Sequence, residues 1–157
     1  ETLDDLIEVE FNEPILSEEV RALPWHFGGQ RYHNLFVDSN FIQDFCRETG
    51  MRVCLDVSHS KLACTHLNAS FSTFLKAILP FTAHLHLADA KGVDGEGLQI
   101  HDGEIDWEQL LALMDELAPK ASFIPEIWQG HKNNGEGAWL ALERLENCAG
   151  NKNQEAA

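Results

Sequence analysis

The sequence predicts an α/β protein in which four short strands alternate with helices. Strands that alternate with helices imply a parallel sheet, because a helix is the usual right-handed crossover between parallel strands. Four such units form either a small open sheet or half of a (β/α)8 barrel, and periodicity alone does not decide between them. A complete barrel usually needs about 250 residues, so this chain of 157 residues would be roughly half of one.

Four segments have the length and composition of strands. Residues 6–11 (LIEVEF) alternate apolar and acidic side chains, as expected for a strand with two different faces. The other three are short and rich in residues that favour strands, namely residues 52–57 (RVCLDV), 83–88 (AHLHLA) and 122–127 (SFIPEI).

Helices are expected after these strands, from apolar residues at helical spacing and from the residues that begin and end helices. Asp106 can cap a helix that has Gln109 three residues later and that Pro119 ends. The other expected helices are residues 39–49, which Gly50 ends, residues 70–79, which Pro80 ends, and residues 137–148. We therefore expect one partial domain over residues 1–150 and a flexible polar tail over residues 151–157.

The composition restricts the possible partners and the compartment. The net charge of −15 argues against a nucleic-acid partner, because Lys and Arg are needed to release counterions from phosphates. The four cysteines form no C-x-x-C pair, which is typical of buried free thiols in a reducing compartment. No apolar run is long enough to span a membrane, so we expect a soluble, cytoplasmic protein.

Polar side chains lie near the carboxyl end of every predicted strand, where α/β folds place their active sites. These residues are Glu10, Asp56, His86 and Glu126, and His59 follows three residues after Asp56. Three carboxylates buried together would repel one another unless a cation joined them. Carboxylates with one imidazole suit Mn²⁺, Mg²⁺, Co²⁺ or Zn²⁺, so a divalent metal site is the favoured interpretation over unrelated polar strand ends.

Other candidate residues have structural explanations that compete with functional ones. His26 and Arg31 lie in a loop with paired glycines and could hold sugar hydroxyls or a phosphate, although a structured rim loop is an equal alternative. Lys91 could steer an oxyanion, but solvation is the simpler explanation. Trp128 could form an apolar wall for a sugar ring or could simply pack. His84 shares the strand face of His86, and for His84 a packed, hydrogen-bonded role is favoured.

Several motifs resemble those of the xylose-isomerase-like TIM barrels, a group that includes sugar isomerases, sugar epimerases and abasic-site nucleases of the endonuclease IV type. The matching pieces are residues 55–59 (LDVSH), 86–91 (HLADAK), 95–106 (GEGLQIHDGEID) and 125–126 (PE). The resemblance covers most of residues 5–148, but only the second half of the family's barrel. It therefore implies the C-terminal half of a (β/α)8 TIM barrel with four strand–helix units.

The resemblance also implies roles for individual residues. Asp56, His86 and Glu126 would bind the metal, and His59 would bind substrate or a second metal. The fourth ligand is usually a Glu on the strand that opens this half. Glu10 is chosen for that role, although Glu8 lies on the same face and Glu13 precedes a proline, so the register stays open.

Two longer segments are similar to a narrower group, the isomerase-like domain appended to some N-acetylneuraminate (sialic acid) synthase proteins. They are residues 25–31 (WHFGGQR) and 125–137 (PEIWQGHKNNGEG). One departure from the family is His101, which stands where a glycine is common, and another is the absence of the nuclease D-x-H motif in this region.

The leading hypothesis is a sugar or sugar phosphate isomerase or epimerase, in which Glu10 and Glu126 transfer a proton through a metal-stabilised enediolate. The alternatives are a non-catalytic appended domain that binds a sugar or a partner, and a metal-dependent abasic-site phosphoesterase. A half-barrel would leave two sheet edges exposed. An upstream half-barrel or a homo-oligomer is therefore expected to cover them.

Overall fold

The fold is a parallel sheet with helices packed along one face. The computed structural model describes residues 6–7, 37–92 and 95–155. The sheet has the order β1-β2-β3-β6, and every neighbouring pair is parallel. Its strands are β1 (Leu6–Ile7), β2 (Arg52–Asp56), β3 (Thr82–Leu87) and β6 (Ser122–Pro125). The alternating pattern predicted this parallel pairing, and successive strands that pair in chain order are the arrangement of part of a (β/α)8 barrel.

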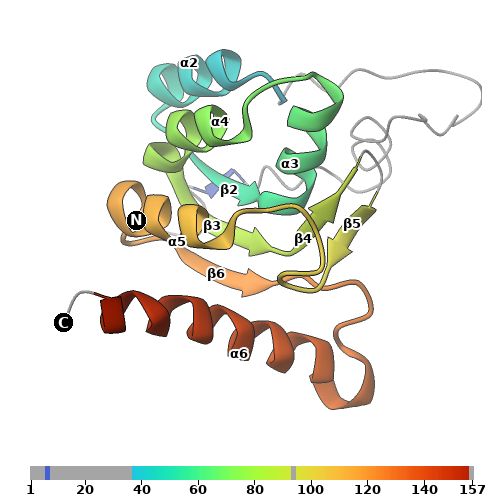
Figure 1. Ribbon diagram of the computed structural model, residues 1–157. Helices are drawn as coiled ribbons and strands as arrows, with labels where there is room; N and C mark the ends of the chain where they lie inside the picture. Colours follow the sequence, from blue (N-terminus) through green and yellow to red (C-terminus); the bar gives the residue numbers. More distant parts are fainter. Residues whose placement is uncertain (1–5, 8–36, 93–94, 156–157) are drawn as a thin grey trace, which may run out of the picture.

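The helices form a continuous layer outside the sheet. In this layer α2 packs against α4, α4 against α5, and α5 against α6 (Figure 1). The helices of the described chain are α2 (Ser39–Thr49), α3 (Val57–His66), α4 (Phe71–Ile78), α5 (Trp107–Leu117) and α6 (Lys132–Glu155), with a 3-10 turn η3 at Leu79–Phe81. The expected caps are present, since the Asp106 carboxylate accepts the Gln109 N–H and Gly50 ends α2 in the left-handed region.

The two faces of the sheet have different chemistry. Leu55, Leu85 and Leu87 are at most 3% exposed and belong to the apolar core that includes the helices. The alternate positions along the same strands carry polar side chains, among them Asp56 and His86. Because successive side chains on a strand point to opposite faces, the helix-covered face builds the core and the other face carries the candidate site.

Three features differ from the expected elements. The predicted strand over residues 52–57 ends at Asp56, and the helix α3 begins at once. Sequence reasoning missed α3 because buried side chains occur all round it, so it has no polar stripe. The glycine-rich segment after β3, for which no strand was expected, contains an antiparallel hairpin of β4 (Asp89–Lys91) and β5 (Gly95–Leu98).

The last helix also differs from its prediction. The helix α6 spans Lys132–Glu155, but Asn133, Asn134 and Gly135 have left-handed φ and ψ angles that interrupt it. The regular helix therefore begins after Gly135, close to the predicted start at residue 137, and it continues beyond the predicted end at residue 148. Since α6 extends to Glu155, it includes most of the tail expected over residues 151–157, and the flexibility of that tail stays a prediction. Within the described sheet, β1 and β6 form the two edges, and Phe123 and Ile124 on β6 are exposed.

Candidate metal centre

Three candidate ligands converge at the carboxyl ends of three adjacent strands. Asp56 ends β2 and is paired in register with His86 on β3. Glu126 follows β6, and its N–H donates to the Leu87 carbonyl at 2.9 Å, which continues the pairing of β3 with this segment. One ligand atom from each of Asp56, His86 and Glu126 lies within 4.8 Å of the others. The parallel register thus brings together residues that are far apart in sequence.

Asp56 is held by the helix that it begins. Its Oδ1 accepts the backbone N–H of His59 at 2.8 Å, as an N-cap carboxylate does in the first turn of a helix. The imidazole ring of His59 contacts the same carboxylate, because its Nδ1 lies 2.8 Å from Oδ2 of Asp56. The D-x-x-H spacing is therefore a capping arrangement that fixes both carboxylate oxygens of Asp56.

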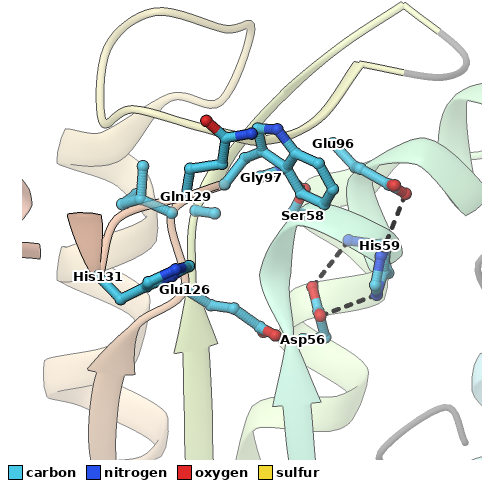
Figure 2. A pocket seen from close by; sticks show the side chains of 11 residues that line it. Asp56, Ser58, His59, Glu96, Gly97, Glu126, Gln129 and His131 are labelled. Carbon is cyan, nitrogen blue, oxygen red and sulfur yellow. Dashed lines mark hydrogen bonds and ion pairs between the residues drawn. The ribbon is translucent and has the colours of Figure 1, made fainter. Parts of the chain in front are cut away.

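His59 lies between two carboxylates. Besides its contact with Asp56, its Nε2 lies 3.4 Å from Oε2 of Glu96 on β5 (Figure 2). Burial lowers the pKa of His59, but hydrogen bonds to Asp56 and Glu96 and the two negative charges outweigh it and raise this pKa to about 10. The imidazole is therefore protonated near neutral pH, and its positive charge partly balances the carboxylates.

His86 also has carboxylate and sulfur neighbours. A hydrogen bond with the Cys54 side chain and one with Glu126, whose Oε2 lies 2.9 Å from Nδ1, raise the pKa of His86 to about 10 despite its burial. His86 is 8% exposed, whereas the side chain of Glu126 is 49% exposed. Glu126 is therefore the member of the three that solvent or a ligand reaches most easily.

A cavity of about 420 Å³ opens beside this cluster. Figure 2 shows Asp56, His59 and Glu96 on one wall, with Glu126 and His131 opposite. The full described lining is Asp56, Ser58, His59, Ala88, Glu96, Gly97, Glu126, Ile127, Trp128, Gln129 and His131. A small polar molecule would meet acidic, imidazole and amide groups in this cavity.

Asp89 anchors the segment that follows the hairpin. It is fully buried, and its Oδ1 accepts the N–H groups of Ala90 and Ile105. Its Oδ2 accepts the His101 N–H and the Trp107 indole N–H. The Asp of the H-L-x-D motif thus fixes the fold of the loop beside the cavity.

The hairpin is also joined directly to the segment after β6. The Trp128 N–H donates to the Gly97 carbonyl at 2.8 Å, and the Gly97 N–H donates to the Ser58 hydroxyl at 3.0 Å. Gly97 has φ +62°, and a Cβ there would lie 3.3 Å from the Trp128 backbone nitrogen. These contacts hold the strand β5 in place, so that Glu96, next to Gly97, lies beside His59.

The remaining predicted site residues have different locations. Trp128 lines the cavity and is 72% exposed, so it is available as a wall. Lys91 is exposed at the end of β4 and is not among the described residues that line the cavity. Glu10, His26 and Arg31 lie outside the described residues, as do Glu8 and Glu13, the alternatives to Glu10.

Sequence reasoning did not single out four polar residues of the cavity, Ser58, Glu96, Gln129 and His131. Glu96 could not be found because its loop is a hairpin that folds back over α3. His131 and Gln129 follow Glu126 closely, and this proximity was the available signal.

The donor set fits a divalent cation. Two carboxylates and one imidazole whose ligand atoms lie within 4.8 Å match the oxygen and nitrogen ligands of Mn²⁺, Co²⁺ or Zn²⁺, and Mg²⁺ accepts the carboxylates. A cation would also offset the repulsion between Asp56 and Glu126. The cluster can therefore hold a metal ion, and its chemistry does not determine which one.

Comparison with protein families gives a match over most of the chain. The family model described as xylose isomerase-like TIM barrel matches residues 21–148. The chain belongs to this family. As a member of the xylose isomerase-like TIM barrel family, it has its candidate ligands where (β/α)8 barrels place their active sites, at the carboxyl ends of the strands. No curated protein matched the chain.

Among the described residues, no helix has the length and apolar character needed to cross a membrane.

Proposed function

We propose that this domain is a divalent-metal-dependent isomerase or epimerase of a sugar or sugar phosphate. The observation that carries the proposal is the convergence of Asp56, His86 and Glu126 beside a cavity of about 420 Å³, which Asp56 and Glu126 line. That volume suits a small metabolite, and the lining offers carboxylate, imidazole and amide groups for hydroxyls. Membership of the family supports a small-molecule substrate.

Asp56, His86 and Glu126 would hold the cation, with Glu10 as the proposed fourth ligand. When bound, the cation would polarise the neighbouring carbonyl and hydroxyl oxygens of an open-chain sugar. Glu126 is half exposed at the cavity, so its carboxylate is suited to accept a proton from a substrate carbon and to return it. Glu10 would be its counterpart on the opposite side of the substrate.

Other residues would bind and orient the sugar. His59 is protonated between Asp56 and Glu96, and its contact with Glu96 at 3.4 Å is the longer of the two, so Nε2 would donate to a substrate hydroxyl in place of Glu96. Trp128, exposed on the rim, would cover the apolar face of the sugar. We retain His26, Arg31 and Lys91 as proposed contacts to more distant hydroxyls or to a phosphate.

The narrower resemblance suggests which sugars to try first. The segments 25–31 and 125–137 resemble the domain appended to some N-acetylneuraminate synthase proteins, so sugars related to sialic acid, such as N-acetylated hexosamines, lead the panel. The upstream half-barrel or second copy that would complete the sheet, and the cytoplasmic location, remain predictions.

The test is solvent proton exchange. The purified chain, loaded with Mn²⁺ or Co²⁺, is incubated in D₂O with aldoses, ketoses, N-acetylated hexosamines and their phosphates, and deuterium at the carbon next to the carbonyl is followed by NMR. We expect exchange or isomerisation of at least one sugar, and its loss in Glu126→Gln. The matched control Glu146→Gln, on the exposed side of α6, should keep the activity. Metal-loaded protein that exchanges no sugar, with the rest of the barrel supplied or without it, would overturn the proposal and leave a binding domain.

A further inference from the structure

A second group of side chains that can bind a metal lies next to the candidate metal centre, closer to the amino ends of β2 and β3. Cys54 pairs with His84 across β2 and β3, two residues before the Asp56–His86 pair on the same strands. A spacing of two residues keeps Cys54 on the face of Asp56 and His84 on the face of His86. The parallel register therefore stacks a sulfur–imidazole layer beneath the carboxylate layer.

The side chains of this layer are close enough to share one ion. One ligand atom from each of Cys54, His84 and His86 lies within 4.8 Å of the others. The rings of His84 and His86 meet edge to face, with centroids 5.4 Å apart. Cys54 is 4% exposed and His86 is 8% exposed, whereas His84 is half-buried. An ion held there would be largely shielded from water yet reachable past His84.

Ser122 orients the most exposed of the three ligands. The Nδ1 atom of His84 lies 2.7 Å from the Ser122 hydroxyl, which holds the ring, so Nε2 would be the ligand atom. Metal-bound histidines usually have such a hydrogen-bonding partner on the other ring nitrogen. The group thus has a feature that a chance cluster of polar residues does not need.

The two neighbouring donor sets differ in softness. Asp56 and Glu126 offer hard oxygen atoms, whereas Cys54 offers a thiolate to a soft or borderline ion. One thiolate and two imidazoles leave a tetrahedral position open, as in catalytic zinc sites. We propose that Cys54, His84 and His86 form a second metal site for a thiophilic divalent cation such as Zn²⁺, with His86 common to both sites.

Sharing His86 couples the two sites. Binding at the sulfur site releases the protons of the Cys54 thiol and of the His86 imidazole to solvent as their bonds to the metal form. An ion that engages His86 in this way draws the imidazole from the carboxylate site, so zinc should weaken Mn²⁺ binding there. The site goes beyond the proposed sugar chemistry, and its test uses metal binding without any activity.

Cobalt reports the sulfur ligand directly. Titration of the reduced full chain with Co²⁺ should give a near-ultraviolet thiolate-to-cobalt charge-transfer band that Zn²⁺ abolishes. The band should be lost in Cys54→Ser and kept in Cys64→Ser, a control at another buried cysteine. It should also be kept in folded Asp56→Asn, which removes a ligand of the carboxylate site but none of the sulfur site.

His84→Gln provides a variant at a half-buried position, where misfolding is less of a concern than at Cys54. We expect its Co²⁺ affinity, measured from the same band, to fall by at least about tenfold, since removing a ligand should cost no less than removing a ligand's hydrogen-bond partner. Folded wild-type protein without the band would overturn the proposal. So would a band that persists in folded Cys54→Ser, or an unchanged affinity in His84→Gln.

Discussion

Replacing Asp89 by Asn should destabilise the domain strongly, although the two side chains have almost the same shape. Each carboxylate oxygen of Asp89 accepts two N–H groups, Oδ1 from Ala90 and Ile105, and Oδ2 from His101 and the Trp107 indole. An amide must present its NH₂ group to one of these pairs of donors. Two hydrogen bonds to a charged group are then lost, which costs about 3–6 kcal/mol.

The assay is urea unfolding of metal-free protein followed by circular dichroism. Domains usually have a free energy of unfolding of about 5–15 kcal/mol, so Asp89→Asn should remove a large part of that free energy. Trp107→Phe gives a graded comparison, because it removes one donor of the four and should cost about 1.5–3 kcal/mol with a small packing loss. Asp102→Asn is the surface control, since the Asp102–Arg144 ion pair is exposed and should change stability by less than about 1 kcal/mol. The reasoning is refuted if Asp89→Asn is no more destabilising than Asp102→Asn.

Three further predictions follow from the same region. Gly103→Ala should destabilise the fold, because its Cβ would lie 2.3 Å from Asp89 Oδ1 and 2.5 Å from a backbone carbonyl; unfolding equal to wild type would contradict this. The raised pKa of His59 stabilises the metal-free protein fully below pH 6.5, and this contribution is lost as pH rises through about 10. Wild type should therefore lose more stability over that range than His59→Gln, and parallel pH profiles would exclude the effect. Because the pKa of His86 is also raised to about 10, Mn²⁺ binding at pH 7 should release about one proton from it. Calorimetric heats should then depend on the ionisation enthalpy of the buffer, and heats independent of the buffer would count against it.

Strand and helix types were largely predictable because their patterns are local. The caps at Asp106 and Gly50 are sequence signals with a direct physical cause, and both act as expected. The helix α3 was not predictable, because it lies against both the sheet and the β4–β5 hairpin and so has too little exposed surface to mark its period.

The candidate site was predictable only in part. Asp56, His86 and Glu126 could be chosen because strand ends in a parallel sheet converge, whatever the detailed packing. Glu96 could not, because its approach to His59 depends on the antiparallel pairing of β4 with β5 and on the Gly97 contacts with Ser58 and Trp128. Long-range contacts of this kind leave no periodic trace in the sequence.

The most direct test of the metal centre is elemental analysis of the chain after Mn²⁺ loading and removal of free ion. Wild type and Asp102→Asn should retain Mn²⁺ in near-stoichiometric amount. Asp56→Asn and Glu126→Gln, folded to the same degree, should retain little. Equal retention in all four proteins, or a folded wild type that retains none even when the rest of the barrel is supplied, would contradict the assignment of Asp56, His86 and Glu126 as metal ligands.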